Sequence, residues 1–98
     1  KYPNLTFEEP DTVNFRNLAL AYEAIRMGGN IPCALNAANE VAVGAFLDQR
    51  ISFIALSDLI GEVLQKSEYI KDPSLDDLIF TNEETRIKTE LLIDSNHF

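Results

Sequence analysis

The sequence is poor in the residues that form disulfides, zinc sites and nucleic-acid surfaces. Its 98 residues include one cysteine, Cys33, and one histidine, His97, which are too few for an internal disulfide or for a zinc site of the usual ligand types. Sixteen acidic residues outnumber eight basic ones, and the formal net charge of −8 opposes binding to a phosphate backbone. No apolar run approaches the roughly 20 residues that span a bilayer. We therefore expect a soluble, cytoplasmic protein that binds neither nucleic acid nor a membrane.

Motifs that bind nucleotides or calcium are also missing. The pair Gly28-Gly29 fits neither GxGxxG nor GxxxxGKS/T, and no strand precedes it, so we interpret it as a helix end. The acidic residues at 76–77 and 83–84 lack the alternating oxygen ligands and the turn glycine of an EF-hand loop. They are typical of a solvated helix start. The sequence predicts no metal or cofactor site within this chain.

What the sequence does contain is helical periodicity. A composition of 46% hydrophobic and 24% charged residues fits one globular domain with one core. Residues 1–14 include two prolines and show no helical period, so they predict an extended linker or lead-in arm. Residues 15–98 predict an all-α, four-helix bundle with short connections. Because the chain opens with lysine and its only methionine is Met27, we expect it to be part of a longer protein.

Apolar positions three and four residues apart predict the first three helices. We expect these helices at residues 15–27, 32–49 and 56–66. In the last segment, Ser74 with Asp77 predicts a capped single turn. Thr81 with Glu84 predicts the capping box of a separate last helix, residues 82–93.

The same spacing predicts which side chains face inward. The residues expected to pack inside the bundle include Tyr22, Phe46, Ile87 and Leu91. Gly61 lies within a predicted helix, where glycine costs up to about 1 kcal/mol relative to alanine. We therefore expect a neighbouring helix to approach closely at Gly61.

The second predicted helix places polar residues in an apolar setting. Asn36, Asn39 and Glu40 fall on one face, because each helical residue advances by about 100°. Val43 and Leu47 continue that face, and the remaining sides are largely apolar. A helix that is apolar nearly all round is normally buried nearly all round. One wall of this burial is therefore expected to come from outside the 98 residues.

A catalytic interpretation would make Glu40 a general acid or base. However, no nucleophile, basic residue or histidine is evidently placed beside it, so a structural role is favoured. We assign no catalytic, cofactor-binding or metal-binding residue. We interpret Asn36, Asn39 and Glu40 as candidate domain-interface residues.

Residues 31–47, IPCALNAANEVAVGAFL, closely resemble the LNAANE signature of the C-terminal domain of the 1-deoxy-D-xylulose 5-phosphate reductoisomerase family. Further support comes from residues 5–7 and 20–24, and the resemblance becomes weaker after Leu64. One departure occurs at Arg16-Asn17, where the family often has proline and cysteine. This difference weakens the expectation that the first helix starts at a proline, and it changes little else.

The resemblance implies a homodimeric parent enzyme that uses NADPH and Mg or Mn. That enzyme rearranges and reduces 1-deoxy-D-xylulose 5-phosphate to 2-C-methyl-D-erythritol 4-phosphate in non-mevalonate isoprenoid biosynthesis. In the family, the NADPH fold, the metal ligands and the substrate phosphate pocket lie upstream of the C-terminal domain. The resemblance therefore implies that this chain alone is inactive, and that its partner is the catalytic domain of the same polypeptide.

If the resemblance is followed, the face of Asn36, Asn39 and Glu40 is expected to dock against the catalytic domain and to stiffen the wall of its substrate cleft. Two other functions are the alternatives to this role. Alternatively, a free-standing helical protein-interaction module would recruit a partner through the same face. A small independent acid–base enzyme is disfavoured, because the residues that it needs are missing.

Overall fold

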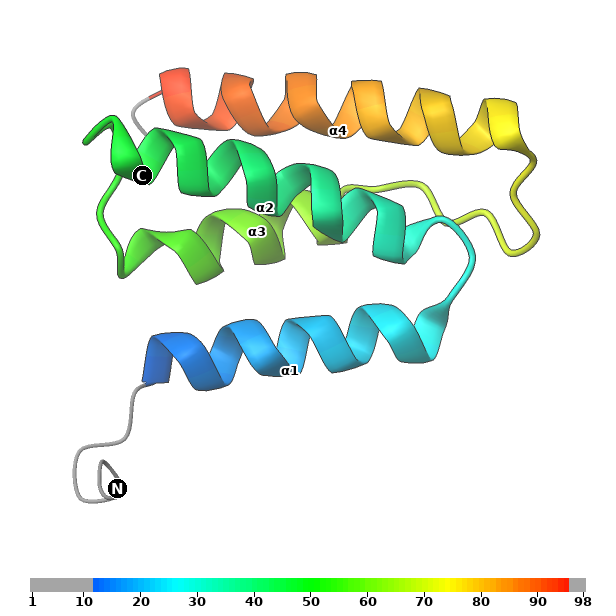
Figure 1. Cartoon of the computed structure of the whole chain (residues 1–98), viewed down its shortest axis with the longest axis horizontal. Helices are drawn as coiled ribbons and strands as arrows, with labels where there is room; N and C mark the ends of the chain where they lie inside the picture. The colour runs from blue at the N-terminus through cyan, green and yellow to red at the C-terminus, as the bar shows by residue number, and fades with distance from the viewer. Residues whose placement is uncertain (1–11, 96–98) are drawn as a thin grey trace.

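The computed structural model describes residues 12–95, and in this range it contains four helices and no strand (Figure 1). The helices are α1 (Thr12–Met27), α2 (Ile31–Leu47), α3 (Ala55–Gln65) and α4 (Leu75–Asp94). The prediction of an all-α, four-helix fold is confirmed.

The predicted lead-in arm ends earlier than residue 14. Helix α1 begins at Thr12, three residues before the predicted start at Phe15. The apolar stripe marks where side chains recur on one face, whereas the backbone can turn helical before the first of them. Residues 1–11 of the predicted arm lie outside the described residues.

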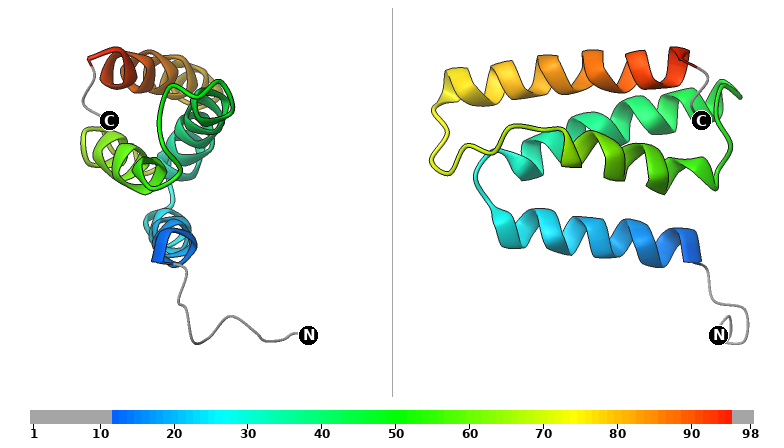
Figure 2. Two further views of the ribbon diagram at one scale, coloured as in Figure 1. Left: turned by 90° about the vertical axis from the view of Figure 1, so that its left-hand side faces the viewer. Right: turned by 180° about the vertical axis from the view of Figure 1, so that it is seen from behind.

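Helix α2 is the centre of the bundle and contacts each of the other three helices. Helices α2, α3 and α4 surround the core, and α1 lies on the side away from α4 (Figure 2). The buried positions of α2 are mostly alanine, and such small side chains let neighbouring helices approach closely. These buried residues are Ile31, Ala34, Ala37, Ala38, Ala42 and Ala45.

Helix α4 is one continuous helix, so the predicted break before Asn82 is wrong. Its start is a capping box at Ser74 and Asp77: the Asp77 amide donates to Ser74 Oγ at 3.1 Å, and the Ser74 amide donates to Asp77 Oδ2 at 3.0 Å. No proline or glycine interrupts the helix afterwards. Thr81 does not cap a second helix because it lies inside the first one, with its side chain buried.

The inward face of α4 is formed by three threonines and, near its end, by Ile93. Thr81, Thr85 and Thr89 are buried, whereas Ile87 and Leu91 are 61% and 63% exposed, so the prediction that the latter two face inward is wrong. Threonine fits there because α4 packs against the alanine-rich helix α2. The buried Thr89 hydroxyl donates to the Thr85 carbonyl at 2.7 Å, which satisfies its donor.

Helix α1 is also turned differently from the prediction. Tyr22 is exposed, so the prediction that it packs inside the bundle is wrong. Among residues 15–27 of α1, the buried residue is Ala24, on the opposite face. Phe46 is half-buried, and its ring lies 5.7 Å from that of Phe53, which agrees with the packing role predicted for it.

Gly61 is not required by a close backbone contact. A Cβ atom added there would lie 3.6 Å from Arg16 Nη2 and 4.0 Å from Leu20 Cδ2, both ordinary van der Waals distances to side chains of α1. Helix α1 is therefore the neighbour of Gly61, but its side chains leave room for an alanine at this position. Gly44 in α2 has still more room, because nothing lies within 4 Å of the added atom.

We expect Gly44→Ala to stabilise the chain by about 0.5–1 kcal/mol, because alanine loses less backbone entropy in a helix and meets no neighbour there. Urea unfolding followed by circular dichroism at 222 nm measures this change. Gly61→Ala serves as the comparison and should give an equal or smaller gain. A loss of stability in Gly44→Ala would contradict the open environment around this position.

Candidate functional site

The outer face of α2 carries the three candidate interface residues. Asn36, Asn39 and Glu40 are all exposed, on the side of α2 opposite its buried alanines. Val43 and Leu47 on the same face are exposed as well. The structure therefore brings the three residues to one surface, and none of the described helices covers it.

Asn36 and Asn39 line a groove between α1 and α2. The groove has a volume of about 530 Å³, with Leu18 on the α1 side and Ile60 of α3 among its lining residues. Within the described part of the chain, neither asparagine side chain has a hydrogen-bond partner. Their amide groups can therefore donate to, and accept from, another polypeptide segment placed along the groove.

Glu40 points to a different neighbour. It forms an ion pair with Arg86 of α4, and Arg86 Nε also donates to Asn82 Oδ1 at 3.1 Å. Sequence reasoning missed this basic partner because 46 residues separate it from Glu40. Both side chains are substantially exposed, and such surface pairs contribute about 0–1 kcal/mol. Glu40 thus lacks the apolar enclosure that a general acid or base would need.

A second groove, of about 990 Å³, separates α1 from α3. Arg16 of α1 and Asp58 of α3 form an ion pair at its edge. Glu23 also lines it, and a hydrogen bond from Arg26, reinforced by that residue's positive charge, lowers the pKa of the Glu23 carboxyl. These exposed pairs are typical of a solvated helix surface rather than of a catalytic site.

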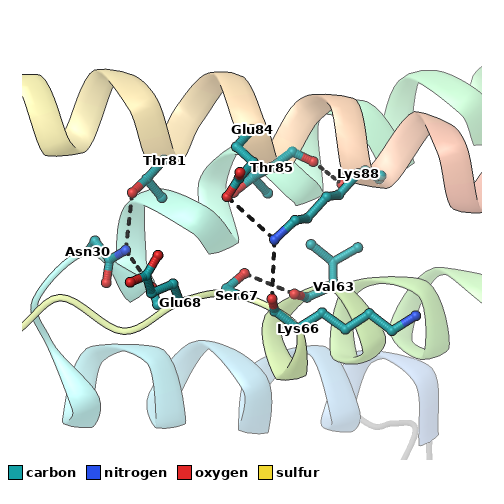
Figure 3. Close-up of polar contacts among 10 residues, drawn as sticks. Asn30, Val63, Lys66, Ser67, Glu68, Thr81, Glu84, Thr85 and Lys88 are labelled. Carbon is teal, nitrogen blue, oxygen red and sulfur yellow. Dashed lines mark hydrogen bonds and ion pairs between the residues drawn. The ribbon is translucent and has the colours of Figure 1, made fainter.

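Sequence reasoning missed the buried side chain of Asn30, which joins three parts of the chain (Figure 3). Asn30 Nδ2 donates to the Glu68 carbonyl at 2.8 Å and to Thr81 Oγ1 at 3.1 Å. Asn30 Oδ1 accepts from the Ile70 amide at 2.8 Å. An asparagine directly before a helix normally suggests an N-cap, but here the side chain makes no cap bond. Its role is to hold the α3–α4 connection and α4 against the start of α2.

The remaining candidate positions are structural where the structure describes them. Gly28 and Gly29 follow α1 with φ of 68° and 61°, which confirms their interpretation as a helix end. Cys33 is half-buried near the start of α2, with Sγ 3.5 Å from the Leu78 carbonyl. His97 lies outside the described residues. Among residues 12–95, no helix is long and apolar enough to cross a membrane.

The described residues do not fit a metal or a dinucleotide. No group of three or more histidine, cysteine, aspartate or glutamate side chains within residues 12–95 is arranged to hold a metal ion. The glycine pair ends a helix instead of opening one, so it does not supply the helix N-terminus that binds a pyrophosphate.

Comparison with known proteins gives a consistent result. Residues 1–88 match the family described as the DXP reductoisomerase C-terminal domain. A 1-deoxy-D-xylulose 5-phosphate reductoisomerase of Bacteroides thetaiotaomicron is 53% identical over 91% of the chain, and one of Phocaeicola vulgatus is 55% identical over 85%. These alignments cover only 23% and 22% of the two relatives. The chain therefore spans less than a quarter of their length.

A solved structure has the same fold. It is a 1-deoxy-D-xylulose 5-phosphate reductoisomerase from Zymomonas mobilis in complex with NADPH, and it is 35% identical to this chain with a TM-score of 0.77. The match covers 95% of this chain and 27% of that one.

Proposed function

Because the chain belongs to the family of DXP reductoisomerase C-terminal domains, we propose that it serves as the helical structural domain of such an enzyme. The longer protein would convert 1-deoxy-D-xylulose 5-phosphate into 2-C-methyl-D-erythritol 4-phosphate, with NADPH as reductant and a divalent metal ion, Mg or Mn. The observation that carries this proposal is 53% identity over 91% of the chain to a relative of that name. The predicted cytoplasmic location stays a prediction.

We assign the chain a supporting rather than a chemical role. Several of its exposed charged residues form surface ion pairs, and its buried polar residues Asn30 and Thr89 form internal hydrogen bonds. These features are typical of a scaffold. NADPH, metal and substrate would be bound by the upstream part of the polypeptide.

The proposed partner is the catalytic domain of the same polypeptide, within a homodimer. The outer face of α2 supports this proposal, because Asn36 and Asn39 line an open groove with amides that have no partner among the described residues. A catalytic domain seated there would gain hydrogen bonds, and α2 would stiffen the adjacent wall of its substrate cleft. Glu40, held by Arg86, would lie at the edge of this contact.

An activity assay with separated parts tests the proposed role. NADPH oxidation is followed at 340 nm with 1-deoxy-D-xylulose 5-phosphate and Mg²⁺ for this chain, for the upstream remainder, and for their mixture. We expect no turnover with this chain alone and turnover in the mixture, because the reacting groups lie upstream and the helical domain supports them. The intact protein is the positive control.

Two results would contradict the supporting role. Turnover by this chain alone would place reacting groups within it, and equal turnover by the remainder with or without the chain would make the domain dispensable. An intact protein that does not oxidise NADPH with this substrate would instead overturn the proposed activity.

A further inference from the structure

Helix α1 exposes an apolar stripe that the bundle does not use. We define the α1 stripe as Phe15, Leu18, Tyr22 and Ile25, which are between 50% and 69% exposed. Their spacing places them on one helix face, and the exposed Ala19 lies between them. Four large apolar side chains on one face form the kind of contiguous patch that marks an interaction surface.

We propose that the α1 stripe is the docking surface for the upstream part of the longer polypeptide. This inference rests on the proposed function, because it takes the chain to be the C-terminal domain of a larger enzyme. It extends that proposal by assigning the apolar part of the contact to α1, beside the asparagine-lined groove of α2. Leu18 belongs both to the stripe and to the lining of that groove, so the two surfaces are continuous.

The first argument is the position of the tether. The matched family is a C-terminal domain, and the relatives are more than four times as long as the matched segment, so most of the enzyme would join this chain ahead of α1. Helix α1 is the first described helix along the chain, and therefore the helix nearest in sequence to that upstream part. Two parts of one polypeptide that are joined near a surface meet there at a high effective concentration.

The second argument is the weak hold of the bundle on α1. Helix α1 does not contact α4 in the described structure, and Ala24 is the buried residue among its residues 15–27. Besides Ala24 and the partly buried Leu20, which packs against the core, α1 is joined to the bundle by three polar contacts: the Arg16–Asp58 ion pair, the bond from Ser57 Oγ to Asn17 Oδ1 at 2.8 Å, and the bond from the Tyr69 hydroxyl to the Met27 carbonyl at 3.1 Å. A partner on the α1 stripe would complete the burial of this helix.

The third argument comes from the competing surface on α4. Phe80, Ile87 and Leu91 of α4 are also exposed. Helix α4 lies on the opposite side of the bundle from α1 (Figures 1 and 2). Glu83 and Glu84 interrupt that surface, and Glu84 is paired with Lys88 of the same helix, whereas Leu18 and Ala19 occupy the corresponding places in the α1 stripe. Burying charged groups is costly, and charged residues are depleted from interface centres. The α4 surface is therefore the poorer docking site.

A matched pair of variants in the full-length protein tests this assignment. Tyr22→Glu alters the α1 stripe, and Ile87→Glu is the control, because the two side chains are 67% and 61% exposed and lie in opposite apolar surfaces. Hydrogen–deuterium exchange followed by mass spectrometry reports protection of α1. We expect Tyr22→Glu to speed exchange in α1 at least tenfold while α2 and α4 keep their protection, and Ile87→Glu to leave α1 unchanged. Tyr22→Phe should retain the wild-type rate.

The outcomes separate the possible occupants. Equal α1 exchange in the two glutamate variants, or faster exchange only in Ile87→Glu, would overturn the assignment to α1. If Tyr22→Glu changes the subunit number in sedimentation without exposing upstream peptides that were protected in the wild type, a second copy covers the stripe and the proposal is wrong. Should Tyr22→Glu unfold α2 as well, Leu18→Glu repeats the test. NADPH oxidation by the wild type separately tests the proposed function.

Discussion

Gly29→Ala is expected to destabilise the chain by on the order of 3 kcal/mol or more, because two effects add. Gly29 has a φ of 61°, and a Cβ atom added there would overlap the Ile70 carbonyl oxygen. The left-handed conformation alone costs an L-residue about 1–2 kcal/mol. The clash is with backbone that cannot easily move, since the backbone N–H of Asn30 donates to the same Ile70 oxygen at 3.0 Å. Urea unfolding followed by circular dichroism measures the loss.

Gly28→Ala is the matched control for this substitution. Gly28 has a similar φ of 68°, but nothing lies within 4 Å of an added Cβ atom. The control should therefore lose only the conformational part, about 1–2 kcal/mol. Equal losses in the two variants would show that the close approach of Ile70 contributes nothing.

Asn30→Asp is the second substitution with a large expected effect. The side chain keeps its size, but it loses the amide group that donates to the Glu68 carbonyl at 2.8 Å and to Thr81 Oγ1 at 3.1 Å. A buried carboxylate would then face two oxygen atoms that are acceptors in the native structure. We expect a loss of about 3–5 kcal/mol at neutral pH, the range for an uncompensated buried charge. Unfolding in urea at pH 7 measures it.

Acidic solution should reduce this defect, because the introduced carboxyl then takes up a proton and regains one donor. Thr81→Val is a milder comparison, because it removes one acceptor of the Asn30 side-chain amide. It should lower the free energy of unfolding by about 1 kcal/mol. If Asn30→Asp unfolds no more easily than Thr81→Val at pH 7, the three-way junction of Asn30 is not a main support of the fold.

The helices themselves were predictable because their signals are local. Apolar spacing and the glycine pair located α1, α2 and α3 to within a few residues, since helix formation depends on residues three and four apart. The error at Thr81 has a local cause as well. Two capping signatures lie in one segment, and only the absence of any helix breaker between them favours the single helix that forms.

The direction in which α1 and α4 face was not predictable from periodicity. Each helix has apolar residues on its outer side, at Tyr22 and at Ile87, and the bundle instead buries small residues such as Ala24 and Thr85. Apolar periodicity identifies one face of a helix but does not show whether another helix of the same chain covers that face. Helix α4 packs against the alanine-rich helix α2, and its buried residues are three threonines and Ile93.

The candidate site shows the same division. The common face of Asn36, Asn39 and Glu40 follows from helix geometry, and the all-helical class follows from apolar periodicity. The family was indicated by the resemblance of residues 31–47 to a known signature. The pairing of Glu40 with Arg86 and the junction at Asn30 join residues 46 and up to 51 positions apart. Only the tertiary structure decides such contacts, because they depend on how the helices pack rather than on the order of neighbouring residues.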